Sequence, residues 1–444
     1  MEDRREFLRK LAAITAFSAM VPDYIYGQVN SENKVALPVI DLHCHPPLKN
    51  YLWDKKMWHW HPSHSGSNSV NMQVDMNHLK KGNVKGLVAV HYLPERGLYE
   101  QAKTIRSLFP WLRKLLPVFV AKLERGDGGN FRQINTMIDE FEYHIEMANS
   151  KNPETPIYIA KNYEQFNSLI QQGKIAVAQS IEGAHALGRD LCCDSRDQYI
   201  EHLDHLIDRG VCMMTLAHFF PNEVVYPVEG IPPAMKNDLG LRWTYSPEED
   251  NKPLTATGKR VVERMLERGM IVDLMHSTPA ARQDVYEINK KYNRPLVFSH
   301  SGVLENFVVN EHNRNYQYMC PTNEEIDIIA ATKGTIGIIF MNFWLTGCDA
   351  HEQGCERREF KNGLNYVIAT IKHIKDRTGS FDYISIGSDF DGLADSPCDL
   401  RDPGYFQELV RRLRETPWIQ SDDIEKILTK NALRVLQNGW GRRS

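Results

Sequence analysis

The chain has 444 residues, of which 42% are hydrophobic and 25% charged, and its formal net charge is −4. The composition is that of an ordinary globular protein, and the length suits one large barrel-type domain or two to three smaller ones. The weak acidic balance excludes a strongly basic, nucleic-acid-binding protein, and no apolar run reaches the roughly 18 residues of a membrane-spanning helix.

The first 33 residues are predicted to be an export leader. Two adjacent arginines, Arg4 and Arg5, precede a short apolar stretch, Leu11–Val21, which is the pattern of a twin-arginine signal. A basic amphipathic helix on a cytosolic protein is the alternative. With such a signal the protein would be exported to the periplasm, and residues 34–444 would form a single catalytic domain.

Eight near-continuous apolar runs follow, and most of them end on a polar, titratable residue. Runs of this kind are typical of strands that are buried on both faces of a parallel sheet. In chain order they are Val35–Leu42, Val84–Val90, Ile175–Ile181, Val211–Ala217, Ile271–Met275, Leu296–Phe298, Thr335–Phe340 and Tyr383–Ser388.

Helical patterns lie between these runs. Asp197–Arg209 and Gly258–Arg268 each place apolar side chains on one face, and each is followed by a glycine of the kind that ends helices. Eight alternations predict a (β/α)8 TIM-type barrel, with a terminal helix over Ser421–Gln437. The alternative, an open doubly wound sheet, lacks its phosphate-binding glycine fingerprint after the first strand. Long connections on the catalytic face are expected at Pro46–Lys80, Phe219–Gly258, Gly302–Glu325 and Asn342–Lys361.

Four histidines and a glutamate are predicted to meet at the carboxyl ends of the strands. His276 and His300 follow two successive strands joined by a helix, so both leave the sheet at the same edge. His43 and His45 alternate at the end of the first strand, and Glu182 ends the third. The four imidazoles could hold two zinc ions bridged by Glu182, each ion with three protein ligands and a shared water. Such a pair of ions makes a bridging hydroxide at neutral pH.

Two further strand ends carry candidate catalytic residues. Asp389, after the eighth run, can accept a proton from the nucleophile and pass it to a leaving amine. His218, after the fourth run, can donate a hydrogen bond to a developing oxyanion. A lone histidine is most often a structural residue, so the prediction depends on the whole set and on its placement at strand ends.

From about Pro38 to Leu436 the chain resembles the membrane (renal-type) dipeptidases, zinc dipeptidases of the amidohydrolase superfamily. Each motif is weak by itself, but their joint order and spacing are specific. The segments that carry the resemblance are Asp41–Pro46, Ser180–Gly183, Arg209–His218, Leu254–His276, Phe298–Ser301, Asn313–Asn315 and Ile386–Gly392.

The resemblance implies a distorted barrel of the metal-dependent hydrolase type with two zinc ions per chain and a small dipeptide-like substrate, often with a D-residue at the carboxyl end. A homodimer is compatible with it. It assigns the carbonyl-assisting role to His218 and the acid/base role to Asp389. Arg314 would grip the terminal carboxylate of the substrate, a task that suits a guanidinium group. The metal ligands that it implies are His43, residue 45, Glu182, His276 and His300.

The chain departs from the family pattern at position 45, where His45 replaces an aspartate. A histidine keeps the metal-binding capacity but removes a carboxylate, so the substrate class stays open. The alternative is the same scaffold hydrolysing an N-acyl amino acid, a lactam or an ester. A catalytically silent binding protein is a third hypothesis, which the presence of every expected ligand type disfavours.

Overall fold

The computed structural model describes residues 36–63, 66–67, 71–101, 103, 129–188, 196–347, 362–392 and 395–441. The predicted leader, residues 1–33, lies outside this part of the chain. Within the described ranges, no helix has both the length and the apolar character needed to cross a membrane.

Eight parallel strands close into a barrel, which confirms the predicted fold class. Each barrel strand pairs with the next barrel strand along the chain, and the pairing of β1 with β10 closes the ring. The short strand β4 pairs with β5 and is not part of the ring. The barrel strands are β1 (Val39–Cys44), β3 (Val84–Tyr92), β5 (Ile175–Glu182), β6 (Val211–Thr215), β7 (Ile271–Asp273), β8 (Val297–Ser301), β9 (Thr335–Ile338) and β10 (Ile384–Ile386).

The observed strands differ from the apolar runs mainly at their ends. β1 begins at Val39, four residues after the predicted start, and β8 continues to Ser301, three residues past Phe298. A short strand that sequence analysis did not predict, β4 (Ile157–Ile159), pairs with the first half of β5 beside the place where β6 begins. The differences arise because hydrophobicity reports burial, whereas strand ends are set by backbone pairing.

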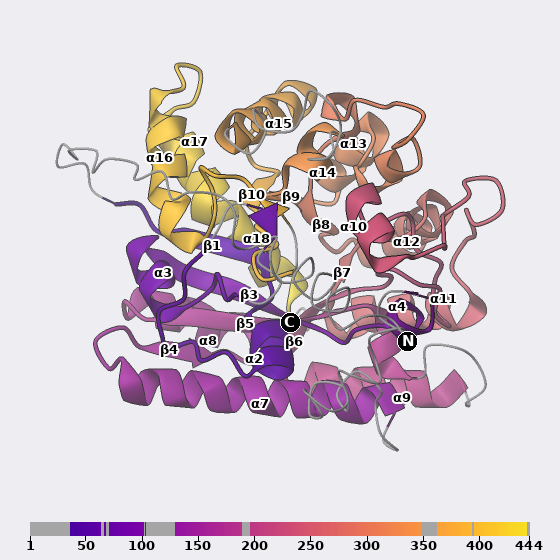
Figure 1. Ribbon diagram of the computed structural model, residues 1–444, viewed down its shortest axis with the longest axis horizontal. Coiled ribbons are helices and arrows are strands. Elements are labelled where there is room, and N and C mark those ends of the chain that lie inside the picture. The colour runs from indigo at the N-terminus through magenta and orange to yellow at the C-terminus, as the bar shows by residue number, and fades with distance from the viewer. Residues whose placement is uncertain are drawn as a thin grey trace, which may run out of the picture.

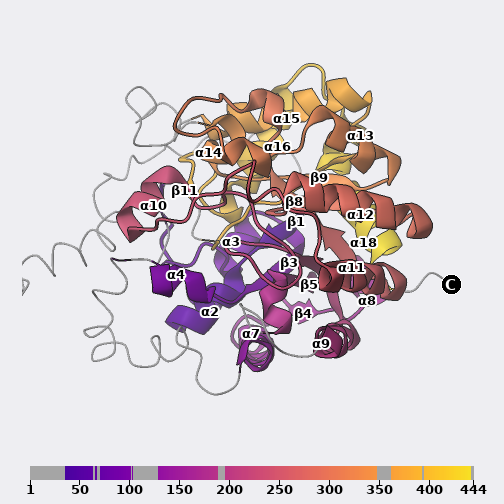
Figure 2. The ribbon, with the colours of Figure 1, turned by 90° about the vertical axis from the view of Figure 1, so that its right-hand side faces the viewer.

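Helices surround the barrel, with α7 along one side and α13 and α15 on the opposite side (Figures 1 and 2). Their starts follow local chemistry: at α12 the Thr278 side chain accepts from the backbone N–H of Ala281, and Pro279 takes the first helical position. The helices are α2 (Pro46–Trp53), α3 (Met76–Lys81), α4 (Arg96–Gln101), α7 (Gly129–Lys151), α8 (Tyr163–Gln171), α9 (Arg196–Asp208), α10 (Pro233–Leu239), α11 (Ala256–Arg268), α12 (Pro279–Tyr292), α13 (Asn323–Ala331), α14 (Asn342–Thr346), α15 (Gly363–Thr378), α16 (Phe406–Glu415), α17 (Ser421–Glu425) and α18 (Asn431–Gly439).

The long connection after β1 is more ordered than the sequence suggests. It contains α2 and α3, and its strand β2 (Gly66–Ser67) pairs antiparallel with β11 (Asp395–Ser396), from the connection after β10. Asp391 ties the same two connections together, because its carboxylate accepts from the backbone N–H groups of Gln73 and Val74. These links hold one wall of the barrel mouth in place.

The carboxyl-terminal helix packs against the barrel, as predicted. It runs from α17 through a π-helical turn, Lys426–Lys430, into α18. Asn431 donates from its side chain to the carbonyl groups of Phe381 and Ile384, at 2.7 and 2.8 Å. These carbonyls lie just before and within β10. The helix therefore covers the amino end of the barrel, and the carboxyl end, where the candidate site lies, is not covered by it.

Candidate metal centre

The two histidines of the first strand end meet at their Nε2 atoms, which lie 3.0 Å apart. His43 is within β1, whereas His45 is the residue that precedes helix α2. Cys44 between them turns away, and its Sγ lies 3.7 Å from the carbonyl oxygen of Val88 on β3. The alternation of side chains along the strand end therefore brings both imidazoles, and not the thiol, to the barrel mouth.

A second pair of histidines lies beside the first. His276, after β7, and His300, on β8, bring their Nε2 atoms to 3.2 Å from each other. His276 adopts the left-handed backbone conformation, with φ of 61°, which is uncommon for a non-glycine residue and is found often at functional sites. The turn that follows β7 is thus bent to aim this ring into the barrel mouth.

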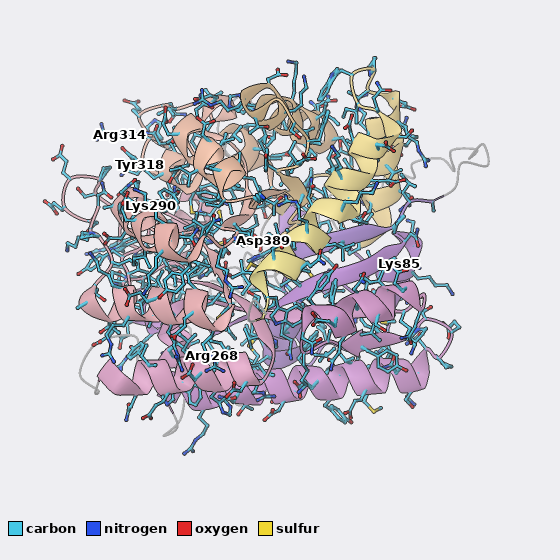
Figure 3. The ribbon with its side chains drawn as sticks, turned by 180° about the vertical axis from the view of Figure 1, so that it is seen from behind. Lys85, Arg268, Lys290, Arg314, Tyr318 and Asp389 are labelled. Carbon is cyan, nitrogen blue, oxygen red and sulfur yellow. The ribbon has the colours of Figure 1, made fainter. Side chains whose placement is uncertain are left out.

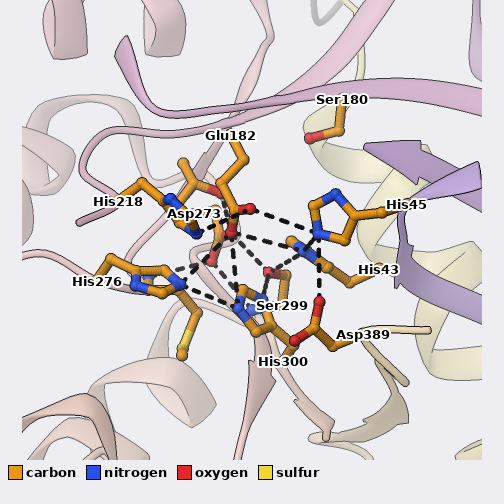
Figure 4. Close-up of polar contacts among 12 residues, drawn as sticks. His43, His45, Ser180, Glu182, His218, Asp273, His276, Ser299, His300 and Asp389 are labelled. Carbon is orange, nitrogen blue, oxygen red and sulfur yellow. Dashed lines mark hydrogen bonds and ion pairs between the residues drawn. The ribbon is translucent and has the colours of Figure 1, made fainter. Parts of the chain in front are cut away.

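Glu182, at the end of β5, stands between the two pairs (Figure 4). Its Oε1 lies 3.6 Å from Nε2 of His43, 3.5 Å from that of His276 and 3.7 Å from that of His300. Its Oε2 lies 3.4 Å from Nε2 of His45. The structure therefore brings together all five residues that the sequence analysis selected as metal ligands.

The electrostatics of this cluster suit a cation. Burial lowers the pKa of His43, His276 and His300 well below the usual value, which favours the neutral imidazole that binds metal. Burial also raises the pKa of Glu182, and its Oε1 is buried without a hydrogen-bond partner. Among the described residues, three sets of ligand atoms are close enough together to hold an ion. Two of them share Glu182: His43, His45 and Glu182, and Glu182, His276 and His300. The third combines Asp273 with His43 and His300. The donor set therefore fits two metal ions.

Polar residues beneath the cluster were missed by the sequence analysis. Asp41 accepts from the backbone N–H and the hydroxyl of Ser388, at 2.9 and 2.5 Å, and so joins β1 to the end of β10. Asp273, at the end of β7, accepts from the hydroxyl of Ser299 at 2.6 Å. The available signal was a charged residue inside an otherwise apolar strand, which burial makes costly unless it is hydrogen-bonded.

His218 faces the cluster from the end of β6. Its Nε2 lies 3.4 Å from Oε2 of Glu182, and its Nδ1 lies 3.2 Å from Oε2 of Glu95. Glu95 also accepts from the backbone N–H groups of Phe219 and Phe220, at 3.0 and 2.8 Å. Glu95, which follows β3, therefore fixes the orientation of the His218 ring, and the sequence offered no signal for a contact across more than a hundred residues.

Asp389 lies at the rim of the cluster. Its Oδ1 is 3.2 Å from Nε2 of His45, and its side chain is 14% exposed, compared with 2% for Glu182. The backbone at Asp389 is left-handed, with φ of 59°. A Cβ on Gly392 would lie 2.0 Å from Oδ1 of Asp389, so the carboxylate needs a glycine at that position. Asp389 thus contacts the cluster on one side and is partly open to solvent on the other.

Arg314 is not brought to the cluster. It is exposed in the segment between the 3-10 turns Leu304–Asn306 and Tyr316–Met319, and Figure 3 shows it at the periphery, away from Asp389. Its neighbour Asn313 is buried and donates to the carbonyl of Gly347 at 2.5 Å. The grip on the substrate carboxylate stays a prediction.

Comparison with known proteins agrees with this geometry. The family model of membrane dipeptidases, peptidase family M19, matches residues 31–439, nearly the whole chain. The chain belongs to the membrane dipeptidase family. The resemblance stated from the sequence motifs is thereby confirmed. The family is one of metallopeptidases, in accordance with the candidate ligand sets that meet at Glu182.

Two curated dipeptidases match this chain over part of their length. The dipeptidase tcpJ of Claviceps purpurea is 28% identical over 269 residues, which cover 61% of this chain and 52% of that protein. An uncharacterised dipeptidase of Schizosaccharomyces pombe is 27% identical over 229 residues, covering 48% of this chain and 51% of that protein. The chain thus spans about half the length of these relatives.

Solved structures support the fold. A metallopeptidase from Rhodobacter sphaeroides, bound to a phosphinate mimic of the dipeptide L-Ala-D-Ala, has a TM-score of 0.66 at 19% identity, covering 91% of this chain and 100% of that chain. The probable dipeptidase PvdM from Pseudomonas aeruginosa has a TM-score of 0.64 at 17% identity, covering 91% of this chain and 96% of that chain. At these identities the likeness concerns the barrel alone.

Proposed function

We propose that this member of the membrane dipeptidase family is a binuclear zinc hydrolase that cleaves the amide bond of dipeptides or dipeptide-like substrates. The observation that carries the proposal is the position of Glu182 within 3.7 Å of the Nε2 atoms of all four candidate ligand histidines, with its Oε1 lacking a hydrogen-bond partner. His43 and His45 would hold one ion, and His276 and His300 the other. When bound, the ions would supply a hydroxide at neutral pH and polarise the scissile carbonyl.

The remaining side chains would orient the substrate and move a proton. Asp389 is the more exposed carboxylate at the cluster, so it can take a proton from the nucleophile and deliver it to the leaving nitrogen. His218 directs Nε2 to the barrel mouth, where it can contact the carbonyl, because Glu95 occupies the Nδ1 side. The roles of Asp389 and His218 require the ends of β10 and β6 to keep fixed positions relative to the cluster, and the closed barrel holds them there.

Metal analysis combined with a substrate panel tests the proposal. We expect two zinc ions per chain, loss of activity with a chelator and recovery with zinc. The panel would contain L,L- and L,D-dipeptides and their N-acetyl derivatives, and we expect hydrolysis of the free dipeptides. A chain that binds zinc but cleaves none of these substrates, or others of their class, would contradict the proposal and favour a silent binding protein.

The predicted grip of Arg314 has its own test. Arg314→Ala is expected to raise KM about 10- to 100-fold for substrates with a free terminal carboxylate, because a charged hydrogen bond contributes about 1.5–3 kcal/mol. Steady-state kinetics on a dipeptide and on its carboxamide would measure this effect. Equal changes in KM for the two substrates would rule out the grip.

A second candidate function follows from position 45. His45 supplies an imidazole where the family has aspartate, and its Nε2 already faces Asp389 at 3.2 Å. Fewer carboxylate oxygens are therefore available at the mouth for a substrate ammonium group. This favours a substrate whose amino group is acylated, or a lactam or ester. A higher kcat/KM for an N-acetyl dipeptide than for the free dipeptide would support this candidate over the first.

A further inference from the structure

One hydroxyl group touches a histidine of each pair. The Oγ of Ser299 on β8 lies 2.8 Å from Nδ1 of His43 and 2.8 Å from Nδ1 of His300 (Figure 4). These are the ring nitrogens that do not face Glu182. All of these side chains are buried. The hydroxyl therefore supports, from behind, one candidate ligand of each ion subsite.

The direction of each hydrogen bond follows from the neighbours of the hydroxyl. A serine hydroxyl has one hydrogen and two lone pairs. Ser299 donates its hydrogen to Oδ2 of Asp273 at 2.6 Å. The Oγ can then only accept, so both imidazoles that face it must carry a hydrogen on Nδ1. A neutral imidazole with a hydrogen on Nδ1 has its free lone pair on Nε2, the atom that faces Glu182.

Asp273 completes the arrangement. Its Oδ2 also accepts from the hydroxyl of Thr215 at 2.5 Å, and its Oδ1 accepts from the backbone N–H groups of Ser299 and Met275 at 3.0 and 3.2 Å. Asp273 is close enough to His43 and His300 to be considered a ligand itself. Because hydrogen-bond donors already occupy both carboxylate oxygens, Asp273 holds Ser299 rather than binding an ion.

We propose that Ser299 is a positioning residue that holds His43 and His300 in the metal-binding tautomer at the same time and thereby links the zinc affinities of the two subsites. The inference rests on the proposed binuclear site. A group that hydrogen-bonds to a ligand histidine fixes its tautomer and orientation, and its loss typically lowers metal affinity about 10- to 100-fold. Here the loss of a single hydroxyl would affect both ions.

Zinc titration of the metal-free protein against a competing chelator tests the inference. Ser299→Ala is expected to weaken both stepwise zinc affinities about 10- to 100-fold. Asp273→Asn is expected to do the same. The backbone N–H groups of Ser299 and Met275 require the amide oxygen at the Oδ1 position, so the NH2 group faces the Ser299 hydroxyl, which can then no longer donate its hydrogen there. The matched control is Ser385→Ala, which removes a buried barrel hydroxyl that pairs with Thr335 at 2.8 Å and should leave both affinities unchanged.

The possible results separate the inference from the proposed function. Wild-type protein that binds two ions, with Ser299→Ala weakening only one of them or neither, would overturn the inference alone. An equal loss in Ser385→Ala would overturn it as well, because the effect would then be one of packing. Binding of a single ion by the wild type would overturn the binuclear proposal and the inference with it. Should Ser299→Ala fail to fold, as judged by the Tm of the metal-free protein, Asp273→Asn decides by the same criterion.

Discussion

Replacing Glu182 with glutamine is expected to lower kcat/KM at least about a thousandfold, equivalent to about 4 kcal/mol of transition-state stabilisation. The variant should also bind fewer than two zinc ions. An amide keeps the shape of the side chain but offers one weak oxygen ligand in place of two anionic ones, so it cannot bridge two ions. Metal analysis and steady-state kinetics on the same preparation would measure both effects.

The stability of the metal-free protein shows whether this loss arises from unfolding. Burial raises the pKa of Glu182, so the empty site carries the cost of a buried carboxylate, and glutamine removes that cost. The Tm of metal-free Glu182→Gln should therefore equal or exceed that of the metal-free wild type. Zinc should raise the Tm of the wild type more than that of the variant. Glu142→Gln, on α7 outside the barrel mouth, is the matched control. Full zinc content in Glu182→Gln would contradict the bridging role.

The second large effect is expected for Asp389→Asn, which should lower kcat about 10²- to 10⁴-fold, the usual contribution of general acid–base catalysis. Asparagine fits the left-handed backbone at this position, and Asp389 is outside the proposed ligand sets. Zinc content and KM should thus change little. Kinetics on amide substrates, together with metal analysis, would establish this separation of kcat from binding.

Leaving-group chemistry gives this prediction a control. Expulsion of an amine requires a proton, whereas expulsion of a phenolate does not. Asp389→Asn should therefore slow an amide substrate more than an aryl ester with the same acyl group. An equal loss on both substrates would assign Asp389 to activation of the nucleophile alone, and an unchanged kcat on the amide would exclude it as the acid/base.

The apolar runs in the sequence predicted the barrel and the five-residue cluster, because both depend on where each strand lies and where it ends. In a closed parallel barrel, the residue that ends each strand lies at the same mouth. The ends of β1, β5, β7 and β8 therefore meet wherever the sequence specifies those strands, and His43, Glu182 and His300 could be chosen from the end of an apolar run. The order of the barrel strands follows chain order, whereas the extra strand β4, which pairs with β5, was not predicted.

The residues that the sequence did not reveal act through contacts between distant segments. Glu95 meets His218 because a connection after β3 passes beside the end of β6. Arg314 carries a family motif, yet its side chain is exposed and away from Asp389. Loops have no period of their own, so their course depends on what they pack against.

The sequence by itself determined which side chains reach the mouth of the barrel, since hydrophobic periodicity and parallel crossovers fix the position of each strand end. Only the tertiary structure decided which nitrogen faces inward in the imidazoles of His43, His300 and His218. That choice depends on the hydrogen-bond partner behind the ring, Ser299 for His43 and His300 and Glu95 for His218. The partner behind His43 and that behind His218 come from strands and connections far away in the chain, so only the closed fold brings them into contact.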